Sequence, residues 1–137
     1  MRLKIKQLRG IIPSRAYPTD SGLDLCAVYG GTLLPGDTAK IPTGVAIELP
    51  EGFEAQVRPR SSFSARGLIV PLGTIDQSYR GEIGVVIFNL SHKTVVITPG
   101  DRIAQLVVCP VAYPEIEVVD ELTPSDRGCC GFGSTGR

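Results

Sequence analysis

The chain has 137 residues, which suits a single domain with one core, and 42% of them are hydrophobic. Its 16 glycines and 11 prolines favour short strands joined by turns over long helices, and its 14 basic residues only balance 14 acidic ones. The balance argues against a nucleic-acid-binding protein, and no apolar run reaches the roughly 20 residues of a membrane helix. We therefore expect an all-β, cytoplasmic protein that forms one domain over residues 1–137.

The four cysteines, Cys26, Cys109, Cys129 and Cys130, contain no CxxC pair, and His92 is the only histidine. A zinc site is therefore not predicted. Adjacent cysteines rarely bond to each other, so free thiols in a reducing compartment are expected.

The segment PTDSGLDL, residues 18–25, places Asp20 and Asp24 around a Ser-Gly corner. This spacing is typical of an Asx turn, in which an aspartate accepts a backbone hydrogen bond. The alternative is a carboxylate directed at a metal-bound water. The residues themselves leave both interpretations open.

Two PGD sequences, at 35–37 and 99–101, predict tight corners. In each, proline presets φ, glycine accepts a positive φ, and the aspartate can bond back to the backbone. After the first corner, residues 45–49 and 53–58 alternate between apolar and polar side chains. That period predicts two half-buried strands.

The segment RPRSSFSARGL, residues 58–68, carries three arginines and three serines. We expect one helical turn over 60–66, with Ser61 as its N-cap and Gly67 ending it. Amides near Ser61 and Ser62 would then face an anion. The alternative is a solvated loop.

The segment GTIDQSYRGEIGVV, residues 73–86, contains two strand-like runs around a polar turn from Asp76 to Gly81. The pattern predicts a hairpin that carries Asp76, Tyr79 and Glu82. An aspartate at such a place is usually turn chemistry, whereas a catalytic role needs a water to deprotonate.

Three further apolar runs, 83–90, 94–98 and 102–111, predict deeply buried strands. Gln105 is a polar residue inside the last of these, so it requires a hydrogen-bond partner.

The last segment, RGCCGFGSTGR (127–137), is too rich in glycine to form a regular element. Its amides can form an anion-binding nest, to which Ser134 and Thr135 add hydroxyls and Arg127 adds a guanidinium. Phe132 can stack on a planar ring. The alternative is a frayed terminus without function.

In this order the segments resemble the motifs of one family over nearly the whole chain. These are PTDSGLDL, RPRSSFSARGL, GTIDQSYRGEIGVV, GDRIAQLV and RGCCGFGSTG, and the family is the trimeric dUTP pyrophosphatases, or dUTPases. The resemblance implies a distorted antiparallel β-barrel or jelly roll, with residues 1–126 as the core. It also implies a flexible arm over residues 127–137 that closes the active site, and a homotrimer with shared active sites.

The activity that this resemblance implies is magnesium-dependent hydrolysis of dUTP to dUMP and pyrophosphate. That reaction limits uracil incorporation into DNA and supplies dUMP for thymidylate synthesis. By the motif match, Asp76 is the general base that deprotonates the attacking water, and Tyr79 packs on the deoxyribose. Asp24 acts near the magnesium through water, while the triphosphate itself holds most of the metal.

The resemblance also implies further substrate contacts. Backbone groups of the third segment hold the uracil, and polar groups of the second, fourth and fifth segments hold the phosphates or close the site. These residues are Gly73, Thr74, Ile75 and Gly84 for the base, and Arg60, Ser61, Ser62, Gln105, Arg127, Phe132, Gly133, Ser134 and Thr135 for the rest.

Two alternatives share the fold. One is an enzyme like the dCTP deaminases, which the segment RSSFSARGL also resembles. The other is a non-catalytic jelly-roll module. The YRGEIGVV sequence and the glycine-rich segment with its phenylalanine argue against the first, and the full set of reactive positions argues against the second.

Overall fold

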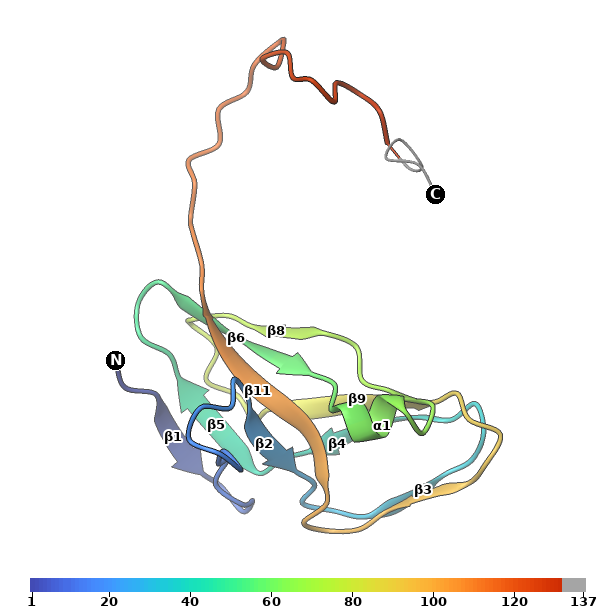
Figure 1. The fold of residues 1–137 in the computed structure, drawn as a ribbon. Helices are drawn as coiled ribbons and strands as arrows, with labels where there is room; N and C mark the ends of the chain where they lie inside the picture. The colour runs from blue at the N-terminus through green and yellow to red at the C-terminus, as the bar shows by residue number, and fades with distance from the viewer. Residues whose placement is uncertain (132–137) are drawn as a thin grey trace.

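The computed structural model describes residues 1–131 and contains one helical turn among eleven short strands (Figure 1). The all-β prediction is therefore confirmed. In chain order the elements are β1 (Lys4–Gln7), β2 (Leu23–Cys26), β3 (Gly31–Leu33), β4 (Thr38–Pro42), β5 (Val45–Glu48), β6 (Phe53–Arg58), α1 (Ser61–Ser64), β7 (Leu68–Ile69), β8 (Gly73–Ile75), β9 (Gly84–Asn89), β10 (Val95–Ile97) and β11 (Arg102–Pro110).

The strands form antiparallel sheets around one hydrophobic core. Their orders are β2-β11-β6-β8, β4-β9-β7, β1-β5 and β10-β3. The long strand β11 lies inside the largest sheet, between β2 and β6. Its Ile103, Ala104 and Leu106 side chains are fully buried, as expected for this strand.

The prediction of deep burial is wrong for β9 and β10 in the single chain. Along β9, Val85 and Ile87 are fully buried, but Phe88 is 37% exposed. In β10, Val96 is 62% exposed. Each of these strands packs only one face on the core, so the other face points outward.

The predicted hairpin over residues 73–86 is also wrong. Strand β8 pairs with β6, whereas β9 pairs with β4 and β7, so the two lie in different sheets. The backbone of Ile83 explains the separation, because its carbonyl accepts the Thr43 amide (3.1 Å) and its amide donates to the Val45 carbonyl (2.9 Å). These long-range bonds draw residues 76–83, here called the crossing loop, from one sheet to the other.

The turn predictions hold at the PGD corners. Gly36 and Gly100 have φ of +87° and +90°. The carboxylates of Asp37 and Asp101 each accept a backbone amide three residues upstream, at 2.8 Å.

The helical turn is shorter than predicted. It covers Ser61–Ser64, and its N-cap is Arg60 rather than Ser61, with no side-chain capping bond. Gly67 does adopt a positive φ of +75°, so the helical turn gives way there as expected.

The chain leaves the barrel after β11, and residues 111–131, here called the C-terminal segment, run outward without helix or strand (Figure 1). The described strands thus end well before residue 126, and a core boundary at that residue stays a prediction. All four cysteines are free thiols, as predicted. Within residues 1–131, no helix has the length and apolar character needed to cross a membrane.

A buried amide fixes the end of β9. Asn89 is fully buried, and its side-chain nitrogen donates to the carbonyls of Leu33 (2.9 Å) and Lys93 (2.8 Å). Its side-chain oxygen accepts the Ser91 amide and hydroxyl. One side chain therefore joins β9 to β3 and closes the turn that leads to β10.

We expect Asn89→Ala to lower the free energy of unfolding by about 2–4 kcal/mol, because buried carbonyls lose their donors. Urea denaturation at one fixed protein concentration measures this loss. The control Ser91→Ala keeps both donated bonds, so it should cost less than about 1 kcal/mol. Equal losses in the two variants would contradict a central role for the amide.

Candidate active site

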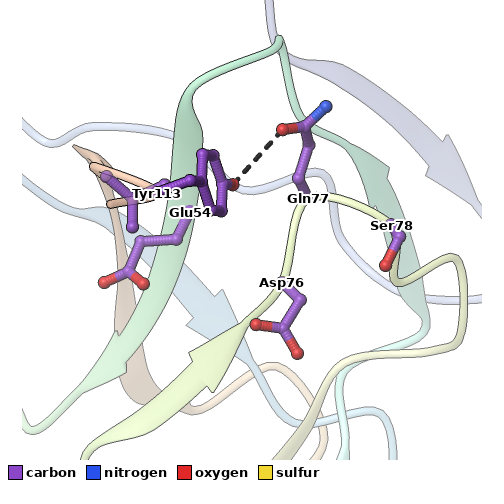
Figure 2. A pocket seen from close by; sticks show the side chains of 6 residues that line it. Glu54, Asp76, Gln77, Ser78 and Tyr113 are labelled. Atoms are coloured by element: carbon purple, nitrogen blue, oxygen red, sulfur yellow. Dashed lines mark hydrogen bonds between the residues drawn. The ribbon is translucent and has the colours of Figure 1, made fainter. Parts of the chain in front are cut away.

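Asp76 follows β8 directly and begins the crossing loop. The Tyr79 amide donates to the Asp76 carbonyl at 3.0 Å, which makes a tight turn. The Asp76 side chain borders a cavity of 470 Å³, which Glu54, Gln77, Ser78, Val111 and Tyr113 also line. Figure 2 shows the carboxylate of Asp76 on one side of this cavity and that of Glu54 on another. Its acidic side chain is thus open to a small molecule.

A second, smaller cavity of 210 Å³ also reaches Asp76. Every residue predicted to hold the base or the sugar lines it, namely Gly73, Thr74, Ile75, Tyr79 and Gly84. Lys40, Val57, Glu82 and Ile83 complete the wall. The structure therefore brings the predicted base and sugar residues together in one pocket beside Asp76. Its wall contains the backbone of residues 73–75, the backbone of Gly84 and the Tyr79 ring.

Two glycines shape this pocket. A Cβ at Gly84 would come within 2.6 Å of Lys40 Cε, so a side chain there would displace the lysine. A Cβ at Gly81 would collide with the hydroxyl end of Tyr79. The glycines let the two side chains lie directly against the backbone.

Tyr79 is held at its hydroxyl end. Its hydroxyl donates to the carbonyl of Glu82 at 3.1 Å, and its side chain is half-exposed. A ring in this position can lie against a sugar that enters the pocket.

A second group of predicted residues gathers where β2, β11 and β6 run together. The Asp24 carboxylate contacts Arg60 Nε at 3.0 Å and an Arg102 guanidinium nitrogen at 3.4 Å. Arg60 also donates to the Arg102 carbonyl at 3.0 Å. Asp24 therefore holds the Arg60 guanidinium in a defined direction.

Gln105 is half-buried, and it has the hydrogen-bond partner that the sequence required. Its side-chain amide donates to the Pro59 carbonyl at 2.9 Å, which fixes the chain just before Arg60. Ser61 and Ser62 follow at the exposed surface of α1. Burial, followed by the nearby Asp24 carboxylate, raises the pKa of the Cys26 thiol, so this thiol is neutral at physiological pH.

The surroundings of Asp24 show whether it could bind magnesium directly. Both of its carboxylate oxygens face guanidinium groups, so the side chain does not fit a direct metal ligand. No group of three or more His, Cys, Asp or Glu side chains in residues 1–131 is arranged to hold a metal ion. The residues described fit a metal that arrives on a phosphate chain better than one held by the protein.

Within one chain, Asp76 and Arg60 lie at opposite ends of β6. Asp76 follows the β8 residue that pairs with Ala55, near the start of β6, whereas Arg60 lies beyond its end. Six residues of extended chain between Glu54 and Arg60 span roughly 20 Å. Arg127 is exposed in the C-terminal segment, where its Nε donates to the Cys130 carbonyl at 2.9 Å. Phe132, Gly133, Ser134 and Thr135 lie outside the described residues.

Some pocket residues were not anticipated. Lys40, Glu54 and Tyr113 come from strands and segments remote from the crossing loop, and no local pattern marked them. Glu82 belongs to the segment 73–86, which the sequence analysis singled out. Its contacts with Arg9 and Gly44, however, could not be predicted from the sequence.

Comparison with known proteins identifies the family of this chain. Residues 9–136 match the model of the dUTPase family. The chain is 51% identical to the deoxyuridine 5'-triphosphate nucleotidohydrolase of Anaeromyxobacter sp., over 88% of this chain and 86% of the relative. It is 45% identical to the protein of the same name from Gloeothece citriformis, over 99% and 97% of the two chains.

Solved structures give the same result. A dUTPase of Staphylococcus bacteriophage 80alpha, described with dUpNHpp, superposes with a TM-score of 0.94 and 30% identity over 99% of both chains. A mutant dUTPase from phage phi11 of S. aureus, described as coordinating a structural Mg(II) ion, has a TM-score of 0.83 and 29% identity, over 88% and 98%. The match in sequence and fold spans nearly the whole chain, which therefore belongs to the dUTPase family.

Proposed function

We propose that the protein hydrolyses dUTP to dUMP and pyrophosphate in the cytoplasm, with magnesium as its cofactor. The observation that carries this proposal is the pocket at the crossing loop, where Gly73, Thr74, Ile75 and Gly84 surround a site shared with Asp76 and Tyr79. The reaction removes dUTP, which limits uracil incorporation into DNA, and its product supplies thymidylate synthesis.

In this mechanism Asp76 is the general base. Its carboxylate accepts a proton from the water that splits the bond between the α- and β-phosphates. Because Asp76 borders both cavities, a water can reach it from one side while the nucleotide occupies the other. Phosphoryl chemistry then depends mainly on positioning and on charge stabilisation.

Backbone groups select the base. Uracil and cytosine present opposite donor and acceptor patterns at their pairing edge, so fixed backbone amides and carbonyls that fit one leave groups unpaired with the other. The residues from Gly73 to Ile75 are held in a strand against β6, which fixes these groups. The Tyr79 ring lies where it can pack on a deoxyribose and obstruct a 2′-hydroxyl.

The second group of residues binds phosphate. The Arg60 guanidinium, held by Asp24, precedes the exposed Ser61 and Ser62, and Gln105 fixes the chain that carries them. Magnesium carried by the triphosphate would neutralise negative charge on the leaving pyrophosphate. Asp24 acts on this site by orienting Arg60, and any contact of Asp24 with the metal would be through water.

We infer a homotrimer in which each active site combines residues of several chains. The separation of roughly 20 Å along β6 between Asp76 and Arg60 supports this inference, because the proposed base and the proposed phosphate-binding arginine of one chain lie at opposite ends of the strand. The C-terminal segment supports it too, since Ile116, Val118 and Leu122 are between 87% and 93% exposed. Such side chains call for an apolar partner surface. Residues 127–137, with Arg127, Phe132, Gly133, Ser134 and Thr135, would then close a site on another subunit.

The substrate range tests the proposed reaction. We expect pyrophosphate from dUTP with magnesium, none from dCTP or dTTP, and far less from UTP at the same concentration. Asp76→Asn should lower turnover by about 10²–10⁴-fold while nucleotide binding remains, because the amide keeps the shape but cannot accept a proton.

Coupled assays for pyrophosphate and ammonia, with isothermal calorimetry for binding, measure these outcomes. Ammonia from dCTP would identify a deaminase instead, and a protein that releases neither product would be a non-catalytic module. Normal turnover by Asp76→Asn would remove Asp76 from the role of base.

Mixing two inactive variants tests the shared site. Asp76→Asn and Arg60→Ala change different groups, so each alone should be nearly inactive. When the two are unfolded together and refolded at equal amounts, about a quarter of the sites should pair an intact residue 76 with an intact residue 60 from another chain.

Activity recovered to about that fraction of the wild-type value is the expected result. The matched control mixes the two folded variants without unfolding, which leaves the trimers separate. Light scattering should show a mass about three times that of the 14.6 kDa chain. No recovery after co-refolding would show that both residues of a site come from the same chain.

A further inference from the structure

Glu82 lies at the end of the crossing loop and contacts two segments outside it. One of its carboxylate oxygens accepts the Gly44 backbone amide at 2.8 Å. The other accepts a guanidinium nitrogen of Arg9, also at 2.8 Å. The side chain is 25% exposed, so these bonds form partly out of water. A single carboxylate thus joins the loop to two parts of the chain that are distant in sequence.

The groups that hold this carboxylate are themselves fixed. Gly44 has a φ of +71°, and its carbonyl accepts the amides of Leu8, Arg9 and Gly10 at 2.8–3.2 Å. A Cβ at Gly44 would collide with Gly10, so the two backbones are in close contact. The Arg9 guanidinium also lies over the Tyr29 ring, 5.8 Å from its centre. The attachment point is therefore a crowded, hydrogen-bonded corner.

The backbone of the same residue faces the substrate pocket. The carbonyl of Glu82 accepts the Tyr79 hydroxyl at 3.1 Å, and both residues line the cavity with Gly84. A half-exposed tyrosine has few packing neighbours to fix its ring. Its position therefore depends on the carbonyl that it bonds. The Ile83 amide of the same peptide unit donates to the Val45 carbonyl at 2.9 Å, and the Glu82 side chain adds a second anchor on the other side of the carbonyl.

We propose that Glu82 is a positioning residue that fixes Tyr79 against the sugar, with Arg9 as its partner, and thereby sets the preference for deoxyribose over ribose. This inference rests on the proposed dUTP hydrolysis. The anchored carboxylate holds the carbonyl, the carbonyl holds the phenol, and the ring occupies the space that a 2′-hydroxyl would need. Without the anchor the ring can move aside, and UTP is accommodated.

A purely structural ion pair is the competing explanation, because partly exposed pairs often contribute little to stability. The two explanations differ in what they affect. A structural pair changes the amount of folded enzyme, which lowers the rates for dUTP and UTP equally. A positioning residue changes the ratio of kcat/KM for dUTP to that for UTP, which does not depend on the folded fraction.

The test measures this ratio for the wild-type enzyme, Glu82→Ala, Glu82→Gln and Arg9→Gln. We expect Glu82→Ala to lower it by about 5- to 30-fold, the factor that corresponds to about 1–2 kcal/mol. Glu82→Gln keeps an acceptor for the Gly44 amide, so it should preserve more of the ratio. Arg9→Gln removes one of the two anchors and should fall between the wild type and Glu82→Ala.

The matched control is Glu48→Gln, which removes another carboxylate from an ion pair, with Lys4 at 2.6 Å on β1 and β5. Its ratio should equal that of the wild type. A double-mutant cycle with Tyr79→Phe adds a second measurement. Since Tyr79→Phe already lacks the hydroxyl that Glu82 holds, Glu82→Ala should change the ratio little further in that background.

A wild-type ratio in Glu82→Ala, within about twofold, would overturn the positioning role. An undiminished effect of Glu82→Ala in the Tyr79→Phe background would also overturn it, because Glu82 would then act on the sugar by another route. If the wild-type enzyme itself fails to hydrolyse dUTP, the proposed function fails instead. The two failures are therefore distinguishable.

Discussion

The pairing of β11 with both β2 and β6 is the constraint on which the rest of the structure depends. In this register Gln105 lies opposite Asp24 on one side and Arg58 on the other. Three segments that are distant in sequence are thereby aligned at one level of the sheet. The ion pair between Asp24 and Arg60 and the bond from Gln105 to Pro59 follow from that alignment. The arrangement of Asp24, Arg60 and Gln105, which we propose binds phosphate, is thus a product of strand register.

Strand β6 connects this group of residues to the pocket at the crossing loop. Its start pairs with β8, which positions Asp76, and its end leads into Arg60. A β-strand is nearly inextensible, so Asp76 and Arg60 of one chain stay at opposite ends of β6. In the proposed trimer, a neighbouring chain would bridge this separation. The crossing loop would then contribute base and sugar recognition, and the opposite end of β6 would contribute charge.

Local patterns predicted much of this. Alternation located β5 and β6, the PGD sequences located two corners with positive φ at glycine, and the motif order located Asp76 and its pocket. The predictions that were wrong concerned contacts between residues that are distant in sequence. Strands β8 and β9 were expected to pair because they are neighbours in sequence, but Thr43 and Val45 bond to Ile83 and separate them. The anchoring of Glu82 by Gly44 and Arg9 likewise joins segments with no shared local pattern.

The exposed apolar residues of the C-terminal segment matter to a chain that has just left the ribosome. Val118 is 93% exposed and Ile116 is 91% exposed, and neither can be covered by the barrel from which the segment departs. In the proposed trimer a partner surface would cover this stretch, and until then it is exposed apolar chain of the kind that favours aggregation. Synthesis rate and subunit encounter would then compete, so the yield of assembled protein should depend on how fast chains are produced.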